Sequence, residues 1–254
     1  MARADYANKT ISLGIVVFPG FDPLDIFGPL ELFSGISYTH NWTLSLVASK
    51  VGPVSSRVPP HVMVPGMPPL EAGHMLQQSI VATHSFQSAP KLDILLIPGG
   101  MGNVFLDQHN DTSIEDFVVQ RFVEVDYLLS VCTGSFSLAK AGVLNGRRAT
   151  TNKASWGWVT KSYGTNVTWV PTARWVEDGK IWSSSGVSSG IDMTYAFLRH
   201  LYGSEDQGLT TLMSTIEYAP HTNPHWDPFA VVNKVPGANE TASLADCVAP
   251  VGLD

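Results

Sequence analysis

The segment over residues 127–139 constrains the fold of this chain most, because an apolar run ends abruptly at a cysteine and a helical pattern follows. A strand that turns sharply into a helix presents the side chain at the turn near the positive end of the helix dipole. The Ser130-Val-Cys132-Thr-Gly134 pattern is a cysteine form of the nucleophile elbow. We predict that Cys132 is an exposed nucleophile with a stabilised thiolate. The alternative is a small buried side chain.

Apolar runs alternate with helical periodicity along the rest of the chain. Strands are predicted at residues 11–18, 42–48, around 62–64, within 75–86, and at 92–97, 127–131 and 167–170, with a hairpin over 173–183. Helices are predicted at residues 22–33, 112–125, 133–141, 153–163, 188–202 and 205–218. This alternation predicts a single α/β domain over residues 1–254, with a mostly parallel sheet between helix layers. Its core spans about residues 11–218, and an irregular tail follows over 219–254.

Composition narrows the class of partner. The chain has 254 residues, of which 44% are hydrophobic, and its net charge is −7. Its 15 Lys and Arg form no cluster, so we expect neither nucleic acid nor a membrane as a partner. No apolar stretch is long enough to span a bilayer, and no metal-binding motif occurs. The cysteines Cys132 and Cys247 are both expected to be free, since a bridge between them would block the nucleophile.

The sequence leaves the compartment open. The N-terminus lacks the apolar region of a signal peptide, which favours the cytoplasm. Five Asn-x-Ser/Thr sequons nevertheless occur, at Asn8, Asn41, Asn110, Asn166 and Asn239. They are either coincidental or a sign of passage through a secretory pathway.

Three strand ends carry unusual residues, and the carboxyl ends of parallel strands meet at one edge of a sheet. Asp25 follows the first strand within an apolar segment, and it is either a helix-capping charge or a proton shuttle for the thiol. Gly99 and Gly100 follow the strand at 92–97 and form either a tight turn or, with the Thr133 amide, an oxyanion site. We expect these residues to converge on Cys132.

No histidine has a position that favours a cysteine–histidine pair. Where cysteine hydrolases of this sheet class often hold a histidine, shortly after the nucleophile helix, this chain has Asn152. We therefore predict that Cys132 pairs with Asp25. A cysteine–histidine dyad of the protease type is disfavoured.

Several motifs, taken in order, resemble the ThiJ/PfpI superfamily, and in particular the branch of bacterial isocyanide hydratases and their fungal relatives. They begin with Phe18-Pro-Gly-Phe-Asp-Pro-Leu-Asp25, Ile97-Pro-Gly-Gly100 and Ser130-Val-Cys132-Thr-Gly134. They continue with Gly146-Arg-Arg-Ala-Thr-Thr151 and Ser185-Gly-Val-Ser-Ser-Gly-Ile-Asp192. The similarity covers about residues 11–203. The segment His225-Trp-Asp-Pro-Phe-Ala230 resembles the fungal subgroup.

The resemblance implies a flavodoxin-like three-layer sandwich, a homodimer and no cofactor. It assigns the nucleophile to Cys132 and the acid to Asp25, and places Gly100 and Thr133 at the oxyanion site. Substrate contacts would come from Asn152 and the loop with Val187, Ser188 and Ser189. The implied activity is hydration of an isocyanide to an N-substituted formamide. The alternatives are a glyoxalase or deglycase, a lyase or cyclase of secondary metabolism, and a non-catalytic redox sensor.

Overall fold

A seven-stranded sheet forms the centre of the computed structural model, which describes residues 6, 9–63, 75–163, 165–242 and 244. The strand order is β10-β11-β7-β6-β1-β2-β5. The strands are β1 (Ile11–Val16), β2 (Trp42–Ala48), β5 (His84–Ser85), β6 (Ile94–Ile97), β7 (Tyr127–Ser130), β10 (Trp175–Asp178) and β11 (Ile181–Ser184). All neighbours pair in parallel except β10 and β11, which form an antiparallel hairpin. The predicted, mostly parallel sheet is therefore confirmed.

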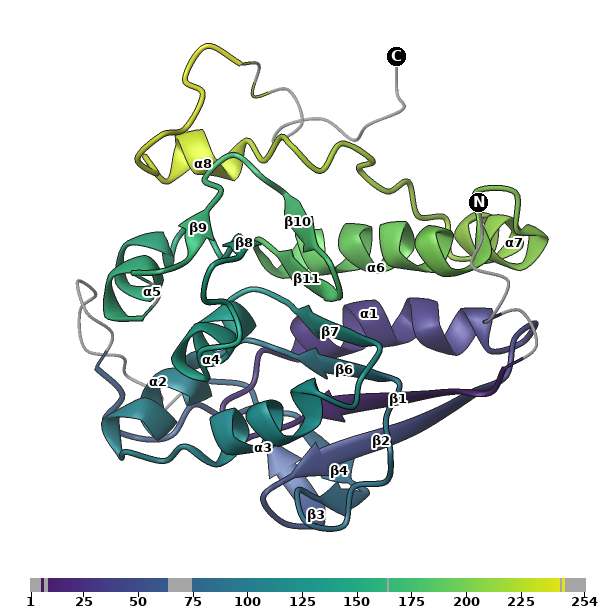
Figure 1. Ribbon diagram of the computed structural model, residues 1–254, viewed down its shortest axis with the longest axis horizontal. Coiled ribbons are helices and arrows are strands. Elements are labelled where there is room, and N and C mark those ends of the chain that lie inside the picture. Colours follow the sequence, from purple (N-terminus) through teal and green to yellow (C-terminus); the bar gives the residue numbers. More distant parts are fainter. Residues whose placement is uncertain (1–5, 7–8, 64–74, 164, 243, 245–254) are drawn as a thin grey trace.

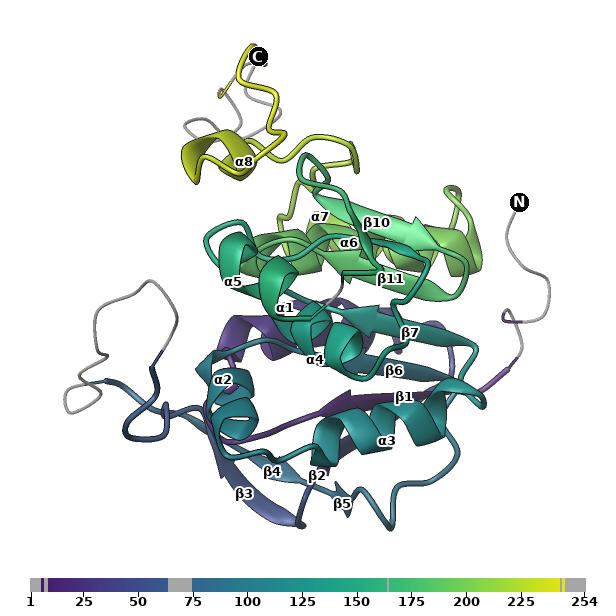
Figure 2. The ribbon, with the colours of Figure 1, turned by 60° about the vertical axis from the view of Figure 1, so that its left-hand side comes forward.

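Helices cover both faces of this sheet (Figure 1). One face carries α1 (Pro23–Ile36), α6 (Val187–Tyr202) and α7 (Gln207–Thr215). The other carries α2 (Met101–Gln108), α3 (Ser113–Phe122) and α4 (Gly134–Lys140), and the rotated view in Figure 2 shows the same layers. The remaining elements are α5 (Trp156–Ser162), α8 (Phe229–Val232) and two small sheets, β3 (Gly52–Ser55) with β4 (Ser79–Ala82) and β8 (Arg148–Ala149) with β9 (Thr168–Trp169). The arrangement is a flavodoxin-like three-layer sandwich.

The central strands bring the three predicted segments together. Every residue of β6 and β7 is buried, which is typical of parallel strands covered on both faces. Ile97 at the end of β6 lies opposite Ser130 at the end of β7, and β1 pairs with the other side of β6. The loops that follow β1, β6 and β7 therefore emerge side by side at one edge of the sheet.

The structure differs from the predicted elements at several places. The strand expected around residues 62–64 is absent at residues 62 and 63, residue 64 lies outside the described part, and β3 forms earlier in the same loop. The helix α2 begins directly after Gly100, where only a glycine-rich turn was expected. The short strand β8 and the four-residue helix α8 were also missed. Elements this short hold too few residues to show a helical or strand period.

The sequons lie mostly at the surface. Asn41, Asn110, Asn166 and Asn239 are exposed, whereas Asn8 lies outside the described residues, as does Cys247. Within the part of the chain that the structure describes, every helix is too short or too polar to cross a bilayer. Use of the sequons, and with it the compartment, stays a prediction.

Candidate active site

Cys132 lies at a sharp bend between β7 and α4. Its φ of 57° is in the left-handed region, which is unfavourable for a residue with a side chain. Two hydroxyl groups hold the bend, because Ser135 Oγ and Thr151 Oγ1 each donate a hydrogen bond to the Cys132 carbonyl at 3.2 Å. Strained backbone of this kind is concentrated at functional sites. The predicted strand–turn–helix geometry is therefore present.

Asp25 reaches this bend from the first turn of α1. The helix is capped by Asp22, whose side chain accepts from the Leu24 amide, so the capping function suggested for Asp25 belongs to its neighbour. Asp25 is fully buried, and its Oδ2 accepts a hydrogen bond of 2.7 Å from the Gly99 amide. Its carboxyl also contacts the Cys132 thiol. The loops after β1, β6 and β7 thus converge as predicted.

Burial is the main reason why the pKa of Asp25 lies well above its usual value, and the charge of Asp22 adds to the effect. The hydrogen bonds with the Gly99 amide and the Cys132 thiol act in the opposite direction and are weaker. The shift is towards the protonated form of the carboxyl group, which is the form that a general acid needs.

The thiol differs from the exposed thiolate that the sequence predicts. Cys132 is only 7% exposed, and burial together with the Asp25 charge raises its pKa well above the usual value. Hydrogen bonds from the Thr133 amide and the Asn152 side chain stabilise the thiolate but do not outweigh these effects. The two groups are adjacent and buried, so ionisation of either one opposes ionisation of the other.

Gly99 and Gly100 orient the pair rather than offering free donors. The Gly99 amide donates to Asp25, and the Gly100 amide donates to Thr133 Oγ1 at 3.0 Å. A Cβ on Gly99 would lie 2.5 Å from Thr133 Oγ1 and 2.9 Å from Asp25 Oδ2. Both amides of the predicted oxyanion site therefore already have acceptors in the protein, and of the three predicted donors only the Thr133 amide faces the sulfur.

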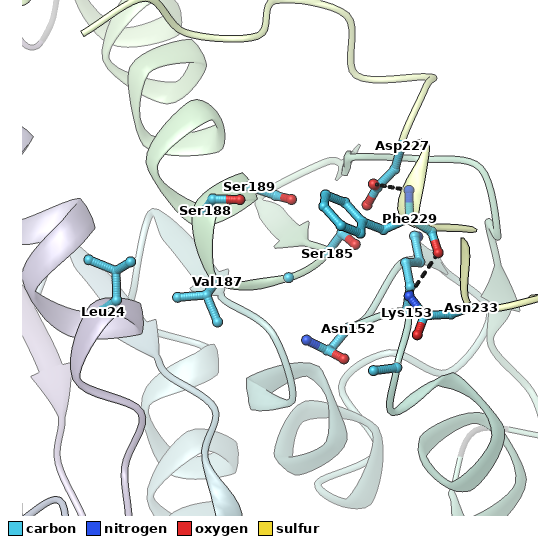
Figure 3. Close-up of a pocket in the computed structure, with 12 residues that line it drawn as sticks. Leu24, Asn152, Lys153, Ser185, Val187, Ser188, Ser189, Asp227, Phe229 and Asn233 are labelled. Carbon is cyan, nitrogen blue, oxygen red and sulfur yellow. Dashed lines mark hydrogen bonds between the residues drawn. The ribbon is translucent and has the colours of Figure 1, made fainter. Parts of the chain in front are cut away.

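A cavity of about 290 Å³ lies beside this pair. Neither Cys132 nor Asp25 lines it, but Asn152 does, and the Asn152 side chain also acts to lower the pKa of the Cys132 thiol. The predicted residues Val187, Ser188 and Ser189 line it from the start of α6 (Figure 3). The other lining residues are Leu24, Lys153, Ala154, Ser185, Gly186, Asp227, Phe229 and Asn233. The structure therefore brings the predicted substrate-contacting residues into one cavity.

The sequence-based reasoning missed Lys153 and the three lining residues of the C-terminal segment. That segment wraps back so that Phe229 and Asn233 of the α8 region close one side of the cavity (Figure 3). Its only signal was the aromatic and Pro-rich motif at residues 225–230. Such a motif does not reveal what it packs against.

Lys153 is an unusual member of this wall. It is buried, and its Nζ donates to Thr150 Oγ1 at 2.7 Å and to the Ala173 carbonyl at 2.8 Å. Its ammonium group also lies 4.9 Å from the centre of the Trp156 ring. Burial lowers the pKa of Lys153 to about 7 despite the opposing charge of Asp227. A cation in this position is close to losing its proton at neutral pH.

These features define an α/β protein with a cysteine at a strained bend after a central strand and a buried carboxyl beside it. The DJ-1/PfpI family model matches residues 12–200, and the chain belongs to this family. An isonitrile hydratase from Pseudomonas putida is 29% identical over 230 residues, which is 88% of each chain. The crystal structure of a ThiJ/PfpI family protein from Pseudomonas syringae has 25% identity and a TM-score of 0.67, covering 85% of this chain and 78% of that one.

More distant solved structures share the fold. Drosophila melanogaster DJ-1beta superposes with a TM-score of 0.60 at 16% identity, over 83% of this chain and 100% of its own. The resemblance seen in the sequence is therefore confirmed at the level of the family.

Proposed function

We propose that this protein is a cofactor-independent hydratase that converts a small isocyanide, R–N≡C, into the N-substituted formamide. Cys132 is the nucleophile and Asp25 carries the proton. The observation that supports this most is the contact between a fully buried carboxyl and the thiol at the strained bend. The similarity to an isonitrile hydratase over most of the chain supports the substrate class.

The raised pKa values of both groups suit the first step. An isocyanide carbon must gain both a sulfur and a proton. Asp25 gives its proton to this carbon while the Cys132 sulfur bonds to it, and the thiol proton passes to Asp25. The product is a thioimidate, R–N=CH–S–Cys132, and Asp25 is again protonated. The Thr133 amide and the Asn152 side chain stabilise the charge that develops on sulfur.

Water completes the reaction. It adds to the thioimidate carbon while Asp25 protonates the nitrogen and takes a proton from the water. The carbon–sulfur bond then breaks as the new hydroxyl group becomes a carbonyl, and its proton returns through Asp25 to the sulfur. The sum is one isocyanide and one water consumed and one formamide formed, with no redox change.

The experiment uses the purified protein and cyclohexyl isocyanide, with N-cyclohexylformamide measured by proton NMR. Asp25→Asn retains an acceptor for the Gly99 amide but loses the acid, so we expect turnover to fall by about 10²- to 10⁴-fold. Cys132→Ala should abolish turnover. Glu31→Gln, an exposed change on the same helix as Asp25, should leave it unchanged. Dialysis against a chelator should also have no effect.

Formation of no formamide by the wild-type protein, or equal formation by Cys132→Ala, would contradict the proposal. Methylglyoxal consumption without isocyanide turnover would favour the glyoxalase alternative. Oxidation of Cys132 by peroxide without turnover of either compound would favour the redox sensor.

We also infer that the protein is a homodimer. Leu24 and Phe27 on α1 are 46% and 41% exposed, so they offer apolar contacts to a second copy of the chain. Leu24 also lines the cavity, so a second copy that covers this helix would lie beside the substrate.

A further inference from the structure

Two buried oxygen atoms in the wall of the cavity have no hydrogen-bond partner. They are Ser185 Oγ and Asp227 Oδ2, and both residues are 0% exposed. Both residues line the cavity next to Asn152. A buried polar atom without a partner is costly, and nearly all such atoms in folded proteins are satisfied. Two of them around one cavity indicate that its contents supply the missing hydrogen bonds.

The rest of Asp227 is firmly held. Its Oδ1 accepts from the Phe229 amide at 3.1 Å, and its own amide donates to the Thr172 carbonyl at 2.7 Å. A guanidinium nitrogen of Arg174 lies 3.9 Å from the same Oδ1. These contacts fix the orientation of the carboxylate and leave Oδ2 as its one acceptor without a donor.

The remaining walls set the size and polarity of the ligand. Leu24, Val187 and Phe229 present apolar groups to the same cavity (Figure 3). Ala154 also lines it. A volume of about 290 Å³ is at the small end for ligand pockets. The ligand therefore has a compact apolar body with a polar group at one position.

The charges around Asp227 determine which polar group this is. The carboxylate repels an anion. Arg174 and Lys153 lie close enough to act electrostatically on this region and disfavour a cation. The polar group is therefore neutral. Asp227 Oδ2 only accepts a hydrogen bond, whereas the Ser185 hydroxyl also donates one. A hydroxyl group has both capacities, since it can donate to a carboxylate oxygen and accept from a serine hydroxyl.

We propose that Ser185 and Asp227 form a subsite for a hydroxyl group of the substrate, remote from the carbon that Cys132 attacks. The hydroxyl donates to Asp227 Oδ2 and accepts from Ser185 Oγ. This assignment rests on the proposed function and narrows its substrates to compact hydroxylated isocyanides. It also gives the motif at residues 225–230 a role, since that motif contributes both Asp227 and the apolar wall of Phe229.

The test compares two reaction products that differ by one hydroxyl group, N-cyclohexylformamide and trans-N-(4-hydroxycyclohexyl)formamide. Their binding to the purified protein is measured by isothermal titration calorimetry. We expect the hydroxylated compound to bind about tenfold more tightly, which corresponds to two well-made hydrogen bonds. Ser185→Ala and Asp227→Asn should each reduce this ratio to about one. Ser214→Ala, an exposed change on α7, should leave it unchanged.

Ser185→Ala keeps the test decisive if Asp227→Asn loosens the C-terminal segment, because Ser185 Oγ has no partner in the fold to lose. Equal affinities for the two formamides, no binding of either, or a ratio that survives in both variants would overturn the proposal. An ordered water that fills the subsite and is not displaced would also give equal affinities, and this outcome would likewise overturn the proposal.

Binding and turnover separate the two proposals. A hydroxyl preference that depends on Ser185 and Asp227, without turnover of either isocyanide, would retain the subsite and reject the hydratase. Turnover of the isocyanides with no hydroxyl preference would reject the subsite and retain the hydratase.

Discussion

Lys153 makes the stability of this protein depend on pH in a way that one substitution isolates. The side chain is buried beside the cavity, where burial and the charge of Arg174 lower its pKa from 10.5 to about 7. Lys153→Met keeps a long apolar side chain and removes the charge. The Ala173 carbonyl and the Thr150 hydroxyl lose a hydrogen-bond donor at every pH, so this loss changes the free energy of unfolding by an amount that does not depend on pH. Only the titration of the ammonium group changes with pH.

The sign follows from proton binding. Between pH 7 and 10.5 the unfolded lysine is protonated whereas the folded lysine is largely neutral, so the unfolded state binds more protons. Stability therefore rises with pH across this window, and the penalty for burying the amine is largest below the folded pKa. With these two pKa values the difference between wild type and Lys153→Met changes by about 3 kcal/mol from about pH 7 to about pH 9.5.

The assay is urea denaturation of both proteins at several pH values within this range, followed by tryptophan fluorescence. Taking the difference between the proteins cancels the other groups that titrate. We expect wild type to gain stability relative to Lys153→Met as the pH rises. Parallel profiles, or a gain by the variant, would refute the conclusion that this amine loses its proton near neutrality on folding.

Two further predictions concern the thiol and the assembly. Burial and the Asp25 charge both raise the pKa of Cys132, and Asp25→Asn removes the second of these causes. Alkylation of Cys132 by iodoacetamide near pH 8 should therefore accelerate while turnover falls. An unchanged or slower alkylation rate would show that the Asp25 charge does not act on the thiol. Phe27→Glu should convert the inferred homodimer into a monomer, as measured by light scattering after size exclusion, and a wild-type protein that is already monomeric would contradict the inferred interface.

The sheet and the convergence of its loops could be predicted because they depend on local patterns. Unbroken apolar runs marked β1, β6 and β7 as buried parallel strands, and parallel strands leave little freedom in where their carboxyl ends meet. Asp25, Gly99 and Cys132 followed from that argument. The order of the strands in the sheet is enough to explain why these three residues lie together in the structure.

The electrostatic state of the pair could not be predicted in the same way. The helix end after Cys132 favours a thiolate, but the actual pKa depends on burial and on a carboxyl group from a distant segment. The sequence gives no measure of burial at a single residue. Likewise, the amides of Gly99 and Gly100 were expected to face a ligand, and only the fold shows that Asp25 and Thr133 accept their hydrogen bonds.

The division of the cavity between two stretches of chain has a consequence for related proteins. The matched family region ends at residue 200, whereas Asp227 and Phe229 lie beyond it and are anchored to the main body through Thr172 and Arg174. The proposed reacting pair and the proposed hydroxyl subsite are therefore carried by separate stretches of the sequence. Exchange of the C-terminal segment between paralogues should alter substrate selectivity without changing Cys132 or Asp25. The same segment is a target for redesigning the range of substrates.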